Sequence, residues 1–143
     1  MKIVIIDGQG GRLGALVTEQ LIKKGLKDSA DNAVIAVGTN SIATAAMIKA
    51  GADAGATGEN PVVVNCADAD IIVCPIGAVI ANSLLGEITP RMAEAVGASK
   101  AEKFLIPSGK CNNHVVGAKD LAMPEYVALA VDGVVDMINK MQS

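Results

Sequence analysis

The stretch IVIIDGQGGRLG, from Ile3 to Gly14, decides the fold of this chain. Its first four residues are apolar and lead into Asp7, which is typical of a strand buried on both faces of a parallel sheet. Glycines follow at once, and apolar residues then recur at helical spacing from Leu13 to Leu21. A strand, a glycine turn and a helix open many nucleotide-binding α/β domains, because the turn amides and the helix N-terminus attract a phosphate.

The glycines match the dinucleotide pattern G-x-G-x-x-G only in a shifted form. Gly8 and Gly10 have the expected spacing, whereas Gly14 comes one residue late. The shift alters how closely the helix approaches the strand, but it still allows a turn with exposed amides. We therefore expect a nucleotide or another phosphate-bearing small molecule to bind at this loop. The residues expected to bind it here are Gly8, Gln9, Gly10, Gly11 and Arg12.

Asp7 is unusual beside a phosphate, because its carboxylate repels a pyrophosphate at close range. Arg12 either neutralises Asp7 or binds a phosphate in bidentate fashion. The structural alternative is that Asp7 accepts hydrogen bonds from the following backbone and forms the turn. Asp7 is also a candidate catalytic residue.

Composition indicates a single domain over residues 1–143, which is long enough for a full core. Hydrophobic residues make up 51% of the chain, and Phe104 and Tyr126 are its only aromatic residues. Charged residues make up 19%, below the usual share of about 25%. Part of the surface is therefore expected to be apolar, which favours a homo-oligomer.

Charge and cysteine content exclude several classes of partner. The net charge is −3, and no basic stripe interleaved with aromatic residues is present, so we expect no nucleic-acid partner. The first apolar run is too short for a signal peptide or a membrane span, so we expect no membrane partner. Three cysteines without a C-x-x-C pair fit a reducing cytoplasm, and we expect the protein to be cytoplasmic.

Apolar runs alternate with helical patterns along the chain, which predicts a three-layer α/β fold with an open parallel sheet and helices on both faces. The expected strands are residues 3–6, 33–37, a short strand within 52–57, 71–74 and 103–107. The expected helices are residues 11–24, 42–50, 60–67, 78–85, 90–98 and a last helix from 124.

Three of these helices leave questions open. Residues 60–67 are rich in valine, but Asn60-Pro61 is a helix-start signal and a strand here would leave too short a crossover, so we prefer a helix. Residues 78–85 are apolar all round, so this helix needs cover from its own domain or a neighbouring subunit, and Asn82 needs a hydrogen-bond partner. The last helix carries one apolar stripe, which packs on the sheet or forms a dimer seam. The stripe consists of Val127, Val131, Val134, Ile138 and Met141.

The second strand ends in Gly38-Thr39-Asn40-Ser41. In NAD-binding versions of this fold an acidic residue there binds the ribose hydroxyls, and this chain offers none. Thr39, Asn40 and Ser41 are neutral donors that suit a 2′-phosphate or a ligand without a second ribose, so among nicotinamide cofactors we expect NADP rather than NAD. The same residues also suit the N-cap of the next helix.

The most varied chemistry lies in residues 108–114. Cys111 and His114 could form a nucleophilic thiolate–imidazole pair, and with Cys74 they could bind a metal. However, C-x-x-H is a weak metal signal, so an ordinary polar loop is favoured and no metal is expected. Cys111 and His114 stay candidate catalytic residues.

Seven segments of the chain together resemble an uncharacterised bacterial family of short single-domain proteins. They are IDGQGG (6–11), GTN (38–40), KAGAD (49–53), GATGEN (55–60), PIG (75–77), IANSLLGEITP (80–90) and KCN (110–112). The resemblance implies a Rossmann-like fold, and it brings no established substrate or catalytic residue. It marks a set of positions for testing. These are Asp7, Gly8, Gly10, Asn40, Glu59, Asn60, Asn82 and Asn112.

The sequence therefore favours a cytoplasmic, oligomeric protein that binds a nucleotide or phosphorylated metabolite at the glycine loop. A chain of 143 residues has no room for the substrate domain of a dehydrogenase, so catalysis would need a neighbouring subunit. The alternatives are a non-catalytic regulatory module, a protein-interaction subunit, and a small enzyme that uses Cys111 and His114.

Overall fold

The computed structural model of this chain describes residues 1–26, 30–108 and 112–143. Its centre is a five-stranded sheet in the order β3-β2-β1-β4-β5, and every neighbouring pair of strands is parallel. The strands are β1 (Lys2–Asp7), β2 (Ala33–Gly38), β3 (Ala54–Thr57), β4 (Ile71–Pro75) and β5 (Glu102–Ile106). Each of them overlaps a strand expected from the sequence.

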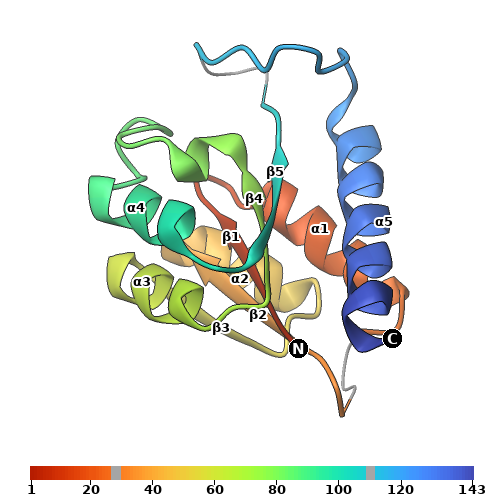
Figure 1. The fold of residues 1–143 in the computed structure, drawn as a ribbon. Coiled ribbons are helices and arrows are strands. Elements are labelled where there is room, and N and C mark those ends of the chain that lie inside the picture. The colour runs from red at the N-terminus through yellow and green to blue at the C-terminus, as the bar shows by residue number, and fades with distance from the viewer. Residues whose placement is uncertain (27–29, 109–111) are drawn as a thin grey trace.

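Helices cover both faces of the sheet (Figure 1). They are α1 (Arg12–Lys23), α2 (Ser41–Lys49), α3 (Glu59–Ala67), the 3₁₀ helix η1 (Ile76–Val79), α4 (Pro90–Ala98) and α5 (Met123–Gln142). Residues of α1, α2 and α5 pack against one face, and residues of α3 and α4 pack against the other. The predicted three-layer, Rossmann-like open sheet is thus confirmed. Over the described ranges, no helix has both the length and the apolar composition that crossing a bilayer requires.

The first strand lies at the centre of both cores. Ile3 and Ile5 belong to the cluster that contains α1 and α5, whereas Val4 and Ile6 belong to the cluster on the opposite face. Side chains of a strand alternate between faces, so a continuous apolar run fits a strand covered on both sides.

The strand order reverses at β1. The chain runs outward from β1 through β2 to β3, and then returns to place β4 on the other side of β1. In open parallel sheets, ligands bind outside the carboxyl ends of the strands at such a reversal. The β1–β4 crevice is therefore the expected binding region.

The structure answers two of the questions that the sequence left open, on residues 60–67 and on the apolar stripe of the last helix. Residues 60–67 are helical, as preferred, because α3 spans Glu59–Ala67. The apolar stripe of α5 packs on the sheet, since its first four members are buried in the core, and for them the dimer-seam alternative is wrong. Only Met141, the last member, is 46% exposed.

The helix expected at 78–85 is wrong. Helical structure ends with η1, and the chain then turns, with left-handed backbone at Asn82, Leu84 and Leu85 (φ 66°, 55° and 56°). The amide of Asn82 donates to the carbonyl of Ile88 (2.7 Å), and the amide of Ile88 donates to Ser83 (3.2 Å). An apolar run of this length does not distinguish a helix from a turn packed on a core. As a result Asn82 is exposed rather than buried.

The packing of α1 on the sheet yields a stability prediction. Leu21 is fully buried in the core, so Leu21→Ala should lower the free energy of unfolding by about 2–5 kcal/mol through lost transfer energy and a residual cavity. Leu129 on α5 is 60% exposed and provides the matched control, for which we expect a change within about 0.5 kcal/mol. Urea unfolding measures both. Equal losses in the two variants would contradict the assigned core.

Candidate functional site

Close packing within the chain explains three of the four glycines from Gly8 to Gly14. Gly11 is the N-cap of α1 with a φ of 73°, and a Cβ there would lie 2.7 Å from the Cα of Ala43 in α2. A Cβ on Gly14 would lie 2.6 Å from the Sδ of Met47. A Cβ on Gly8 would lie 2.7 Å from the Oγ1 of Thr39. These three glycines let α1, α2 and the end of β2 approach β1 closely.

Asp7 is buried and organises the first turn of α1. Its Oδ1 accepts a hydrogen bond from the amide of Gly8 (2.8 Å), and its Oδ2 accepts one from the amide of Gly14 (2.7 Å). Burial raises the pKa of Asp7, the two amide bonds oppose this shift, and the nearby charge of Glu87 adds to it. The interpretation of Asp7 as a turn-forming residue is confirmed.

Arg12 does not neutralise Asp7, so the first of the two alternatives for Arg12 is wrong. Within the described ranges, Arg12 forms no ion pair. It is exposed and borders a cleft of about 490 Å³ between α1 and the start of α5, together with Glu19 and Met123. The guanidinium of Arg12 is therefore not engaged by Asp7.

The residue that completes the loop is Glu87, which the sequence analysis missed. Its Oε1 accepts hydrogen bonds from the amide of Gln9 (2.9 Å), the Oγ1 of Thr39 (2.7 Å) and the Nδ2 of Asn40 (2.8 Å). Its Oε2 accepts none from any residue that the structure describes. Desolvation opposes ionisation, but the three hydrogen bonds outweigh it and hold the pKa of Glu87 below its ordinary value. Glu87 is therefore ionised at neutral pH.

Asn40 links the ends of β1 and β2. Its side-chain oxygen accepts the amide of Ala43 (2.9 Å) and caps α2, which confirms the cap role expected from the sequence. Its Nδ2 donates to the carbonyl of Gln9 (2.9 Å) in addition to Glu87. The side-chain donors of Thr39 and Asn40 thus form hydrogen bonds with groups of the protein itself.

Part of the glycine loop remains open. The amides of Gly10, Arg12 and Leu13 have no hydrogen-bond acceptor among the described residues, and a Cβ on Gly10 would meet nothing within 4 Å. A cavity of about 330 Å³ adjoins the loop, at the carboxyl ends of the central strands. It is lined by Gln9, Pro75, Gly77, Ser83, Leu84, Leu85 and Ser108. The open amides and the cavity lie at the strand-order reversal.

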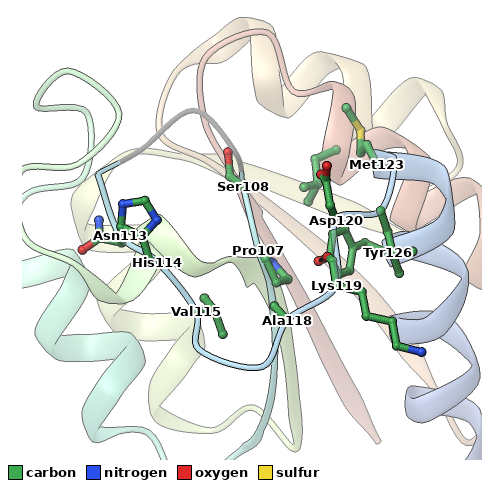
Figure 2. A pocket seen from close by; sticks show the side chains of 12 residues that line it. Pro107, Ser108, Asn113, His114, Val115, Ala118, Lys119, Asp120, Met123 and Tyr126 are labelled. Carbon is green, nitrogen blue, oxygen red and sulfur yellow. Dashed lines mark hydrogen bonds between the residues drawn. The ribbon is translucent and has the colours of Figure 1, made fainter.

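The thiol–imidazole candidates are not brought to this loop by any described contact. Cys111 falls in 109–111, outside the described residues. His114 is exposed and borders a separate cavity of about 430 Å³. Figure 2 shows His114 on one side of this cavity and Asp120 and Tyr126 on the other. Cys74 lies in the core with α3 and α4, and burial raises its pKa. Within the part of the chain that is described, no group of three potential metal ligands is found.

The remaining positions marked by the resemblance lie in carboxyl-edge connections. Glu59 and Asn60 begin α3 after β3, Asn82 lies in the turn after η1, and Asn112 follows β5. Glu59 lies 3.9 Å from Arg91 in an exposed ion pair. Exposed pairs of this kind contribute little to stability.

One signal in the sequence could have found Glu87. The connections after parallel strands all meet at the carboxyl edge of the sheet, and Glu87 is the acidic residue in the connection after β4. The expected helix at 78–85 concealed it, because a helix there would have carried Glu87 away from the loop.

An open parallel sheet with a glycine turn after its first strand and a crevice at the strand-order reversal defines a Rossmann-like α/β protein. The chain belongs to the family described as Domain of unknown function (DUF3842), whose model matches residues 2–139. No curated protein and no solved structure matches the chain. The resemblance to an uncharacterised family is therefore confirmed.

The two carboxylates predict opposite pH effects on stability. Glu87 has a lowered pKa, so its stabilisation is present above the ordinary value of 4.5 and is lost as the pH falls through the folded pKa. Glu87→Gln should therefore cost roughly 1 kcal/mol at pH 7 and less in acid. Asp7 has a raised pKa, so its ionisation weakens the fold as the pH rises above 3.8. Asp7→Asn, which can accept only one of the two amides, should therefore cost more in acid than at pH 7.

Urea unfolding of the wild type and both variants between about pH 3.5 and 7.5 measures these differences. The wild type and the variants share all other titrating groups, so the effect of those groups cancels in the difference in free energy of unfolding between each variant and the wild type. Parallel pH profiles for the two variants would contradict the assigned environments of Asp7 and Glu87.

Proposed function

We propose that this protein binds a nucleotide or another phosphorylated small molecule in the crevice between the carboxyl ends of β1 and β4. The observation that carries this proposal is the set of open amides at Gly10, Arg12 and Leu13. The amides of Arg12 and Leu13 belong to the first turn of α1, a helix of 12 residues whose dipole places partial positive charge there, and Gly10 directly precedes the N-cap residue Gly11. Unpartnered amides at this position favour an anionic ligand.

The loop already binds an anionic oxygen of the protein itself, which supports this assignment. The amide of Gln9, next to the open amide of Gly10, donates to the carboxylate of Glu87 (2.9 Å). Hydrogen bonds to a charged acceptor are stronger than neutral ones. A phosphate on the neighbouring amides would use the same electrostatic field.

The proposed role is binding, and no reaction is assigned to it. A regulatory module and an enzyme completed by a neighbouring subunit both remain consistent with a ligand at this site. We further propose a homo-oligomer, because apolar side chains on separate elements are strongly exposed. They are Ile42, Leu85 and Val116. We propose a cytoplasmic setting, which the free thiols of Cys66 and Cys74 support.

Thermal unfolding with inorganic phosphate, ATP, NADH and NADPH tests the proposal. A ligand at a hundred times its dissociation constant stabilises the folded state by roughly 2.7 kcal/mol, so at least one of the four should raise the melting temperature. Gly10→Val should weaken or abolish that shift, because it adds bulk beside the open amide of Gly10, and a Cβ there meets no atom of the protein within 4 Å, so the fold should stay intact.

Gly97→Val provides the matched control. Gly97 lies in α4, and a Cβ there also meets nothing within 4 Å, so this variant should retain the ligand-induced shift. The absence of a shift with all four compounds, or an undiminished shift in Gly10→Val, would refute the proposed site.

A further inference from the structure

Strand β2 is not followed by an acidic residue of its own, but the carboxylate of Glu87 lies at its carboxyl end. Glu87 reaches the end of β2 from the connection between η1 and α4, and Thr39 and Asn40 hold it there. Its Oε1 lies 3.2 Å from the point that a Cβ on Gly8 would occupy, directly over the glycine loop. In nucleotide-binding sheets of this kind, an acid at the end of the second strand accepts hydrogen bonds from the ribose hydroxyls.

We propose that Glu87 is the ribose-binding residue of this site, so that the ligand is a nucleotide with a free 2′,3′-diol and not a 2′-phosphorylated one. This inference rests on the proposed function and specifies its ligand class. Glu87 takes the role of the missing acid from a different part of the chain.

The two oxygens of the carboxylate have different surroundings. Oε1 is saturated by donors from Gln9, Thr39 and Asn40, which fix the orientation of the group. Oε2 receives no hydrogen bond from the described residues, and it has two lone pairs with which to accept hydroxyl donors. A vicinal diol supplies two such donors at close spacing. The open amides of Gly10 and Arg12 would then bind the phosphate attached to the same ribose.

The charge at this position disfavours a 2′-phosphate. Glu87 is ionised at neutral pH, and like charges at contact distance repel. Across the described residues, Glu87 forms no ion pair that would offset this repulsion, and Arg12 borders the cleft on the α5 side. Of the neutral donors that favoured NADP in the sequence, Thr39 and Asn40 both donate to Glu87. The charge of Glu87 therefore favours NAD over NADP, which is the opposite of the preference expected from the sequence.

The competing explanation is that Glu87 fills the position of the ligand's own anion and must leave before anything binds. The two explanations differ in what Glu87→Gln does. Loss of a ribose acceptor removes the preference for ligands with a diol over their 2′-deoxy counterparts, whereas loss of an internal anion changes the affinity of both forms equally and leaves their ratio unchanged.

The experiment is calorimetric titration of the full chain with ADP, GDP, CDP and UDP, with their 2′-deoxy counterparts, with adenosine 2′,5′-bisphosphate and with inorganic phosphate. At least one ribonucleotide should bind at least about tenfold more tightly than its deoxy counterpart, because a hydrogen bond to a charged acceptor is lost. For an adenine ligand, the 2′,5′-bisphosphate should bind more weakly than ADP. Glu87→Gln should bring ribo and deoxy forms within about threefold of each other, and this ratio is insensitive to the lost charge because both forms carry the same phosphates.

Glu94→Gln, on the exposed face of α4, is the control for the change in net charge and should behave as the wild type. Equal affinity of ribo and deoxy forms in the wild type overturns the inference, and so does a preference for the ribo form that Glu87→Gln leaves unchanged. Binding of phosphate but of none of the nucleotides overturns the inference and leaves the proposed function standing. If neither phosphate nor any nucleotide binds, both fail.

Discussion

One carboxylate oxygen, the Oε1 of Glu87, joins three segments that are distant in sequence. Parallel pairing of β1 and β2 brings Gln9 close to Thr39 and Asn40, and the turn after η1 brings the acid to meet them. Without this acceptor, three donors at the sheet edge would depend on water. With it, the glycine loop and the end of β2 form one rigid edge beside the open amides of α1. The proposed binding site depends on that edge.

The fold was predictable because its signals are local. The continuous apolar run of β1 indicates burial on both faces, and Thr89 with Pro90 marks the start of α4, where the Thr89 side chain accepts the amide of Met92 (3.1 Å). The helix at 60–67 followed from the length of the connection to the strand at 71–74. If residues 60–67 were a strand, that connection would be too short for a parallel crossover. Periodicity, caps and loop lengths are all readable within a few residues.

The site was predictable only in part, because its contacts depend on the path of one turn. The sequence located Gly10, Arg12, Thr39 and Asn40, but Glu87 reaches Gln9 across 78 positions. That reach needs left-handed backbone in the turn after η1, including at Leu84 and Leu85, where no local signal favours it. Such conformations cost of order 1–3 kcal/mol each and persist where surrounding contacts enforce them. Packing of Leu84 against Gly8 and the bonds to Glu87 provide those contacts here.

The most direct test of the central claim is an NMR titration that follows individual backbone amides as inorganic phosphate is added. The claim is that the unpartnered amides of Gly10, Arg12 and Leu13 bind an anion while Asp7 keeps those of Gly8 and Gly14 occupied. The resonances of Gly10, Arg12 and Leu13 should move to saturation with one common dissociation constant, and those of Gly8 and Gly14 should stay nearly fixed. Contradiction would come from Gly10, Arg12 and Leu13 remaining unmoved at phosphate concentrations that shift amides elsewhere in the chain.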